Sequence, residues 1–341
     1  MYITDTMNGF CMQETNFPFV CIIVDDASTD GEQDVIRRYV SEHFDLSDGS
    51  EAYEKETVYA HISYARHKEN KNCYFAVLYL NENHFSARKS KNPYLAEWTN
   101  GCKYDALCEG DDYWVDSLKL QKQYNVLQSH NDCTICVGIT ETMDLYGHAL
   151  GNYLPAKSKD GIFDLGEFCK QQFYNGQWFG HTSTFFFRRK VYEEKIISMI
   201  SNGVFMNFPY GDITIILGCL LYGNGYIISD VMSRYRINSG GFNSSLLTNV
   251  NKAIRVEEQL IKGIEDFDNY THQKYHKYLV NRILWSRCII DYHKSGRNGL
   301  VYLRPKYWRI ARIQGLKTTF LMAAKSVAPG PYHFLKRMLK H

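Results

Sequence analysis

Three carboxylates fall within four positions in residues 108–114, Cys-Glu-Gly-Asp-Asp-Tyr-Trp. This stretch follows a short apolar segment, residues 104–107, and precedes a helical pattern that starts near Ser117. Carboxylate oxygens on a loop after a strand are the ligands that a hard divalent cation such as Mg²⁺ or Mn²⁺ prefers. Such a cation would in turn hold a phosphate-rich ligand. The alternative is a solvated turn in which Asp116 or Ser117 caps the next helix.

A second acidic pair, Asp25 and Asp26, follows another strand pattern. Residues 19–24 form a continuous apolar run, typical of a strand that is buried on both faces of a parallel sheet. In open α/β sheets, ligands bind beyond the carboxyl ends of the strands. We therefore expect Asp26 and Asp111, each at a strand end, to share one site.

The elements that must position these carboxylates alternate along the first half of the chain. The patterns predict helices within residues 2–14, 35–40, 93–99 and 118–127, strands at 58–65, 104–107 and 133–140, and a loop at 81–92. Ser28 or Asp30 is placed to cap the helix that contains residues 35–40. Alternating strands and helices predict an α/β fold with an open, mostly parallel sheet flanked by helices.

The second half is richer in helical patterns. Asp164 and Glu167 have the spacing of a capping box before a helix that reaches Phe173. Strands are predicted at 181–189 and 225–236, and helices at 213–222 and throughout 249–295. The last acidic residue is Asp291, so the tail is basic. We expect one domain over residues 1–245 and a helical, basic C-terminal region over 246–341.

Composition excludes several classes of protein. The chain has 341 residues and a net charge of +2, so nothing in the overall charge predicts nucleic-acid binding. Its ten cysteines have no disulfide-framework spacing, which favours reduced thiols. Cys133 and Cys136 form a C-x-x-C in a strand-like run, and buried thiols are favoured there over a zinc or redox site. No secretory signal or membrane-spanning run is evident, so we expect a cytoplasmic protein.

Two segments together resemble glycosyltransferase family 2, the nucleotide-sugar-dependent enzymes of the GT-A fold. They are residues 24–31, Val-Asp-Asp-Ala-Ser-Thr-Asp-Gly, and 107–114, Leu-Cys-Glu-Gly-Asp-Asp-Tyr-Trp. Residues 119–123, 211–212 and 235–236 support the resemblance, which spans about residues 3–245 and is nearest to the bacterial branch that decorates surface glycans. Family members begin with a strand and a Pro-x-Tyr-Asn segment. This chain starts within the following helix, so that first strand is expected to be missing.

The resemblance implies a reaction and its alternatives. It implies transfer of a sugar from a nucleotide diphosphate sugar donor to a glycan or lipid-linked acceptor, with inversion, in cell-surface polysaccharide synthesis. One alternative is a non-catalytic relative that binds nucleotide or partners in polysaccharide assembly. Another is a phosphate-handling α/β protein that uses acidic strand ends.

The resemblance also implies roles for individual residues. Asp25 and Asp26 would contact the base and ribose, and Glu109 and Asp111 stand in the place of the family's D-x-D motif. Asp111 would bind the Mg²⁺ or Mn²⁺ that bridges the diphosphate, assisted by Glu109 and Asp112. Such a cation neutralises charge on the leaving diphosphate.

Each of five further residues has two possible roles. Asp212 matches the family's general base, the alternative being a helix cap. Arg234 and Arg236 could face phosphates, the alternative being surface pairing. His181 could line the acceptor pocket together with Trp178, the alternative being a packed core position.

The basic tail predicts a membrane contact. Ten lysine and arginine residues and interspersed aromatic residues lie in residues 297–341, without one acid. Basic residues near an anionic surface contribute about 1 kcal/mol each. We expect peripheral attachment to the inner face of the cell membrane, the alternative being a tail packed on the rest of the protein.

Overall fold

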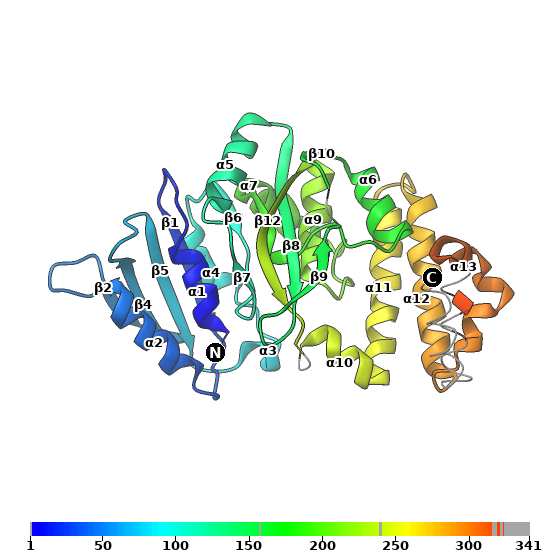
Figure 1. The fold of residues 1–341 in the computed structure, drawn as a ribbon, viewed down its shortest axis with the longest axis horizontal. Helices are drawn as coiled ribbons and strands as arrows, with labels where there is room; N and C mark the ends of the chain where they lie inside the picture. Colours follow the sequence, from blue (N-terminus) through cyan, green and yellow to red (C-terminus); the bar gives the residue numbers. More distant parts are fainter. Residues whose placement is uncertain (1, 157, 239–240, 316–318, 321–322, 324–341) are drawn as a thin grey trace. The chain divides into compact units, whose positions relative to one another are not determined.

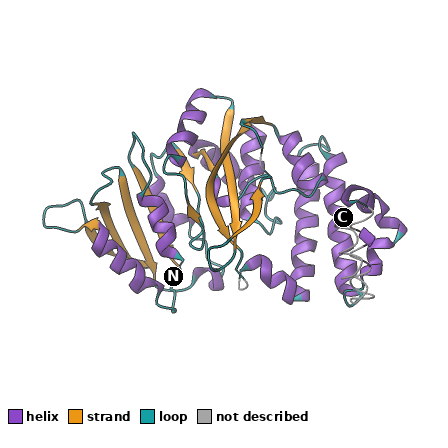
Figure 2. Cartoon of the chain, in the orientation of Figure 1, coloured by secondary structure: helices purple, strands orange, loops and turns teal. Residues whose placement is uncertain are grey.

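The computed structural model describes residues 2–156, 158–238, 241–315, 319–320 and 323, and it has a mixed α/β fold (Figures 1 and 2). The chain forms two compact units. Unit 1 contains Met1–Gly161, Gly180–Arg189 and Tyr226–Arg236, and unit 2 contains Ile162–Phe179, Lys190–Gly225 and Ile237–His341. Because residues 162–179 and 190–225 belong to unit 2, these units do not coincide with the expected division at residue 245.

The first sheet of unit 1 has five strands in the order β1-β5-β4-β2, with β3 paired to β4. The strands are β1 (Phe19–Asp25), β2 (Phe44–Asp45), β3 (Tyr53–Glu56), β4 (Ala60–His67) and β5 (Cys73–Leu80). β1 and β5 run parallel, whereas β4 is antiparallel to β5, β2 and β3. The expectation of a mostly parallel sheet was wrong here, because residues 68–72 between β4 and β5 are too few for the crossover that a parallel pair needs.

Helices cover both faces of this sheet. On one face, α1 (Ile3–Cys11) and α2 (Glu32–His43) share a core with the strands that contains Met7, Ile36 and Phe75. The other face packs against α4 (Asn92–Thr99) through Tyr94 and Trp98. The segment 81–92, predicted as a loop, contains the short helix α3 (His84–Ala87).

The second sheet of unit 1 carries the acidic loop. Within unit 1, its strands follow the order β12-β8-β11-β6, with β7 paired to β12 and β9 paired to β8. They are β6 (Tyr104–Ala106), β7 (Tyr113–Trp114), β8 (Cys133–Met143), β9 (Ala149–Leu154), β11 (Phe186–Arg188) and β12 (Asn224–Arg236). β11 is antiparallel to both β6 and β8. Asp105, inside β6, pairs with Arg189 at 2.9 Å, which accounts for a carboxylate within this strand.

Helix α5 (Lys119–Ser129) packs on this sheet around Trp114, Leu127 and Met232. The thiols of Cys133 and Cys136 are buried in β8, as predicted, and all ten cysteines are free. The predicted strand 181–189 is shorter than expected, because Thr182–Thr184 forms a 3₁₀ turn, η2.

Unit 2 is mostly helical. Its helices are α6 (Leu165–Cys169), α8 (Ile197–Ser201), α9 (Gly211–Tyr222), α10 (Phe242–Thr248), α11 (Val250–Tyr270), α12 (His276–Lys294) and α13 (Trp308–Gln314). Two short π-helices are η1 (Lys170–Tyr174) and η3 (Tyr192–Ile196), and two short 3₁₀ helices are η4 (Gly299–Leu303) and η5 (Pro305–Tyr307). The chain passes from one unit to the other within β10 (Gly161–Phe163) and within α7 (Arg189–Val191). Asp164 caps α6 by accepting from the Glu167 N–H at 2.8 Å, which confirms the predicted cap.

The described part of the basic tail is partly paired. Asp291 on α12 accepts from Arg304 at 3.2 Å, from Lys306 at 2.7 Å and from the Tyr307 hydroxyl at 2.9 Å. Trp308 is 57% exposed and Phe320 is 60% exposed. The other basic and aromatic residues expected at a membrane, from Lys325 onward, lie outside the described residues, as do Lys317 and Leu321. Among the described residues, no helix combines the length and apolarity needed to cross a bilayer.

Candidate functional site

The acidic loop between β6 and β7 closes on itself in a tight turn. The Asp112 N–H donates to the Glu109 carbonyl at 3.1 Å, which makes residues 109 and 112 neighbours. The imidazole of His181, from the segment before η2, joins them. One ligand atom from each of Glu109, Asp112 and His181 lies within 4.8 Å of the others, so these three side chains could hold a metal ion.

Asp111 lies outside this group of three. It occupies a corner of the turn, and its carbonyl accepts from Arg236 Nη1 at 2.8 Å. The metal ligands expected from the sequence were Asp111 and Asp112. The structure keeps Asp112 in the candidate metal site and places Glu109 beside it, because the turn brings together residues three positions apart. His181 joins them from a distant part of the chain.

Burial sets the charges in this group. Asp112 is 1% exposed, and its burial, with Glu109 and Asp111 nearby, raises its pKa to about 8. Burial lowers the pKa of His181 to about 4. His181 Nδ1 lies 3.6 Å from Asp112 Oδ2, but a protonated acid and a neutral imidazole do not form an ion pair at neutral pH. A cation bound here would favour the ionised carboxylate and displace its proton.

A chain of buried hydroxyls orients His181. Its Nδ1 lies 2.8 Å from Ser183 Oγ, which lies 2.8 Å from Ser233 Oγ. Ser233 Oγ in turn lies 2.7 Å from Thr140 Oγ1 on β8. These partners fix the position of the ring, as outer hydrogen bonds commonly do for metal-binding histidines. Sequence reasoning missed this role for His181, since no spacing pattern links it to the acidic loop.

Helix α1 holds the loop from one side. Thr6 Oγ1 donates to the carbonyls of Gly110, at 2.9 Å, and Asp112, at 2.5 Å. A Cβ at Gly9 would lie 2.9 Å from both the backbone N and O of Trp114, so the helix approaches β7 as closely as only glycine allows. The N-terminal helix is therefore part of the scaffold of the candidate site.

The two arginines expected at phosphates already have protein partners. Arg236 is buried, and its guanidinium pairs with Asp5 and lies 4.7 Å from the centre of the Tyr113 ring. Its backbone N–H donates to Asp112 Oδ1 at 3.1 Å, so it supports the candidate metal site. Arg234 is more exposed and pairs with Glu141 at 3.2 Å. This favours the pairing alternative for both residues.

The two aspartates after β1 differ in their surroundings. Asp25 is 3% exposed, and its Oδ1 accepts from Gln33 Nε2 at 2.6 Å and from the Ser28 N–H at 3.2 Å. Its Oδ2 is also buried but has no hydrogen-bond partner in the described part of the chain. An unpaired buried oxygen of this kind is costly unless a ligand or water satisfies it.

Asp26 is fully engaged with the segment that follows β5. It accepts from the backbone N–H groups of His84, at 2.8 Å, and Phe85, at 3.0 Å, and it pairs with Lys91 at 3.0 Å. Burial opposes its ionisation, but Lys91 and the two N–H groups outweigh burial and lower its pKa. Asp26 therefore ties residues 84–91 to the end of β1.

The strand end of β1 and the acidic loop lie within electrostatic reach of each other. The pKa of Glu32, at the start of α2, is raised by burial, and then by Asp30, Asp25 and Asp111. All of these carboxylates belong to unit 1. Asp25 and Asp111 therefore both act on Glu32, while a site shared by Asp26 and Asp111 stays a prediction.

Asp212 belongs to unit 2, where it lies in the first turn of α9. The N-cap position is Tyr210, so Asp212 is not the cap, and its Oδ1 lies 2.8 Å from the Ile213 N–H. A helix N-terminus favours the ionised form of a carboxyl group, but burial dominates here and raises the pKa of Asp212. Trp178 also lies in unit 2 and is 40% exposed.

Comparison with known proteins gives relatives but no activity. No family profile matches the chain. Over 135 residues it is 32% identical to uncharacterized protein Mb1547 of Mycobacterium bovis and to uncharacterized proteins MT1570 and Rv1520 of Mycobacterium tuberculosis. The aligned part covers 40% of this chain but only 30% of the length of each relative.

Proposed function

We propose that unit 1 binds a divalent cation, Mg²⁺ or Mn²⁺, through Glu109, Asp112 and His181. The observation that carries this proposal is the convergence of three ligand atoms within 4.8 Å of one another. Two carboxylates and an imidazole suit Mn²⁺ at least as well as Mg²⁺, because imidazole is a softer ligand than oxygen. The buried hydroxyl chain behind His181 supports the same reading.

We further propose that the ligand of this cation is the diphosphate of a nucleotide sugar. Such a cation supplies positive charge where negative charge builds on the leaving diphosphate. The unpaired Oδ2 of Asp25 can accept from an N–H of the base or a hydroxyl of the ribose. Asp111, near the same strand end, remains a further contact for the cation or the sugar.

The proposed reaction is inverting sugar transfer on a GT-A fold. The acceptor hydroxyl attacks the anomeric carbon, the bond from that carbon to the diphosphate breaks, and Asp212 takes the hydroxyl proton. The raised pKa of Asp212 suits a base that must hold this proton, because it lies nearer to neutrality than that of an ordinary aspartate. The acceptor is a glycan or a lipid-linked sugar.

Calorimetry tests the metal and the donor together. We expect Mn²⁺ to bind the wild-type protein and to be required for the binding of uridine or guanosine diphosphate. With a matching nucleotide sugar, we also expect slow, metal-dependent hydrolysis. Asp112→Asn should abolish metal-dependent binding, and Asp48→Asn, an exposed acid on the same unit, should not. Equal diphosphate binding with and without Mn²⁺ in wild type would remove the basis of the proposal.

A non-catalytic relative is the second candidate. It is favoured by the engagement of Arg234 and Arg236 with protein carboxylates, which keeps these two cations from a diphosphate. Such a protein would bind the nucleoside diphosphate with Mn²⁺ but would neither hydrolyse nor transfer any nucleotide sugar across a panel of donors.

The membrane contact remains a proposal for the C-terminal region. The exposed rings of Trp308 and Phe320 support it, whereas the pairing of Arg304 and Lys306 with Asp291 favours a tail packed on α12. Flotation with vesicles rich in phosphatidylserine tests it. Trp308→Ser should weaken flotation, and Trp98→Phe, a conservative change in unit 1, should leave it unchanged.

A further inference from the structure

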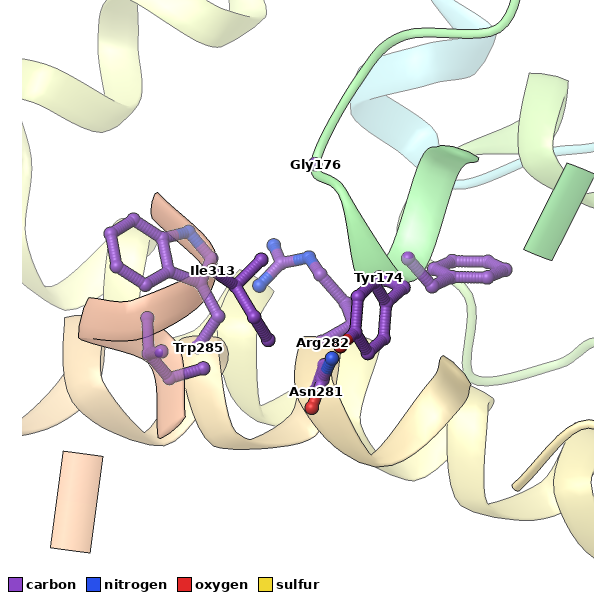
Figure 3. Close-up of a pocket in the computed structure, with 8 residues that line it drawn as sticks. Tyr174, Gly176, Asn281, Arg282, Trp285 and Ile313 are labelled. Carbon is purple, nitrogen blue, oxygen red and sulfur yellow. The ribbon is translucent and has the colours of Figure 1, made fainter. Parts of the chain in front are cut away.

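The cavity in unit 2 is too small to hold a ligand. Residues of α12, α13 and η1 line most of it, with Tyr174 and Trp285 among them (Figure 3). Its volume is about 20 Å³, and one water needs roughly 10–15 Å³. It therefore has room for about one water, whereas unit 1 contains buried polar side chains that lead to the candidate metal site.

Trp114, Lys119 and Gln123 form one connected group of buried side chains in unit 1. Trp114 is 5% exposed, and the other two are fully buried. Lys119 Nζ donates to Gln123 Oε1 at 2.8 Å and lies 4.1 Å from the centre of the Trp114 ring, over its face. The bond from Lys119 fixes the Gln123 amide with its oxygen toward the lysine and its nitrogen facing away.

The remaining donors of this group hold the 3₁₀ turn η2. Gln123 Nε2 donates to the Thr184 carbonyl at 2.7 Å and to the Cys136 carbonyl on β8 at 3.2 Å. Trp114 Nε1 donates to the Ser183 carbonyl at 2.7 Å. Because Ser183 and Thr184 are fully buried, water does not readily replace these donors, and loss of one would leave a buried carbonyl unpaired.

The same turn fixes the backbone of His181. Thr184 donates twice to the His181 carbonyl, from its N–H and from its Oγ1, both at 2.9 Å. Trp114 lies in β7, two residues after Asp112, so its bond to Ser183 ties the end of the acidic loop to the turn. The carboxylates and the imidazole of the candidate metal site are therefore linked through buried hydrogen bonds.

We propose that Trp114, Lys119 and Gln123 are positioning residues that hold His181 at the candidate metal site. Trp114 and Gln123 fix the turn next to the imidazole, and Lys119 fixes the amide of Gln123. The buried hydroxyl chain orients the ring, whereas these three side chains set where the backbone presents it. This inference rests on the proposed metal site, in which His181 is one of three ligands.

Trp114→Phe and Gln123→Glu remove the donors while keeping much of each side chain. Phenylalanine keeps an aromatic ring but cannot donate to the Ser183 carbonyl. Glutamate keeps an acceptor for Lys119 but loses the N–H groups that reach the turn. Both variants should therefore loosen the backbone that carries His181.

Two substitutions on α5 serve as controls. Gln128→Glu is the matched control, because Gln128 is exposed on the same helix and its amide donates to the Tyr104 hydroxyl at 2.6 Å instead of to the turn. Leu127→Val controls for a general loss of stability, because Leu127 is fully buried in the apolar core beside α5.

Nitrogen NMR of the histidine rings in the metal-free protein measures the position of His181 without any metal. Its signals are identified by their loss in His181→Gln. Wild type should show the ring fixed in one tautomer, with its two nitrogens at well-separated shifts. Trp114→Phe and Gln123→Glu should move these shifts toward the average of the two tautomers, and both controls should leave them in place.

Electron paramagnetic resonance of bound Mn²⁺ measures the effect on the ligand. In wild type we expect the spin echo to carry nitrogen modulation from the His181 ring. In Trp114→Phe and Gln123→Glu we expect weaker modulation and a Mn²⁺ affinity lower by about 10–100-fold, the usual effect of losing an outer partner of a metal ligand. Below their melting temperatures, the two controls should match wild type in both measurements.

The two measurements separate this inference from the proposed metal site. Ring shifts and Mn²⁺ affinity that stay at wild-type values in both variants would overturn the positioning role, even if Tm falls. A wild-type protein that binds no Mn²⁺ would overturn the metal site instead, and the ring shifts of the metal-free protein then decide the positioning role by themselves. If Gln123→Glu does not fold, Trp114→Phe provides the same test.

Discussion

The Asp112 carboxyl and the His181 imidazole lie 3.6 Å apart in a buried part of unit 1, and neither carries a charge at neutral pH. Burial raises the pKa of the first to about 8 and lowers that of the second to about 4. The acidic loop is therefore less negative than its sequence indicates. A cation that enters must displace one proton, and this coupling makes the proposed metal site testable.

Asp112→Asn is expected to separate metal binding from folding. Asparagine keeps the acceptor for the Arg236 N–H but cannot supply an anionic ligand. Metal affinity should fall by about 100-fold or more, while Tm of the metal-free protein should stay within a few degrees or rise, because the wild-type residue is already protonated. Mn²⁺ titration followed by electron paramagnetic resonance, with a thermal melt alongside, measures both. A large loss of Tm without metal would show that Asp112 is ionised in the fold.

Metal affinity should rise with pH between 6 and 8. Asp112 must lose its proton to bind, and its pKa is about 8, so each unit below 8 costs up to about tenfold in affinity. His181 stays neutral throughout this range and adds nothing. A flat affinity from pH 6 to 8 would contradict the protonated state of Asp112.

The raised pKa of Asp112 also makes the stability of the metal-free protein depend on pH. The unfolded chain loses the Asp112 proton near 3.8, whereas the folded protein keeps it to about 8. Stability from this group is therefore lost as pH rises from about 4 to 8. Metal-free wild type should melt at a lower temperature at pH 8 than at pH 6, relative to Asp112→Asn as the control.

Arg236→Met should weaken the scaffold of the candidate site. It removes the contacts with Asp5 and the Asp111 carbonyl from a buried position. Since Asp5 is half exposed, we expect a loss of about 2 kcal/mol, less than for a fully buried pair. Arg234→Met, at the more exposed pair with Glu141, should cost less than about 1 kcal/mol. Urea unfolding of both variants measures these losses of stability. If Arg236→Met keeps wild-type stability but binds the diphosphate more weakly, Arg236 contacts the phosphates instead.

Local patterns predicted most elements but not their pairing. The apolar run at 19–24 and the capping residue Asp164 each determine a strand or helix within a few residues, so β1 and α6 were predicted. The orientation of β4 against β5 depends on how many residues join them, and β5 itself was not predicted.

The candidate site, too, was predicted only in part. Carboxylates at strand ends mark its position, because their neighbours in the sequence are also their neighbours in space. The place of His181 and the engagement of Arg236 with Asp5 result from contacts between distant parts of the chain, for which a single sequence carries no periodic signal.

Gly9→Ala is expected to disturb the site through α1. The new Cβ would lie 2.9 Å from the Trp114 backbone, so the helix must move away from β7 and loosen the Thr6 contacts to the acidic loop. We expect a loss of about 1–3 kcal/mol, as for other overpacked positions, and weaker Mn²⁺ binding. Gly161→Ala, whose Cβ would meet nothing within 4 Å, is the control. Equal melts for the two variants would show that α1 does not constrain the loop.

Asp212→Asn tests the proposed base. Asparagine keeps the size of the side chain and its contact with the Ile213 N–H but cannot take a proton from the acceptor. We expect Mn²⁺ and donor binding to survive, and transfer at saturating donor to fall by about 10²–10⁴, the usual range for loss of a general base. Tm should hold or rise slightly, because burial penalises the ionised form that the substitution removes. Turnover near that of wild type, with an unchanged melt, would assign the base to another residue and leave Asp212 as a first-turn residue of α9.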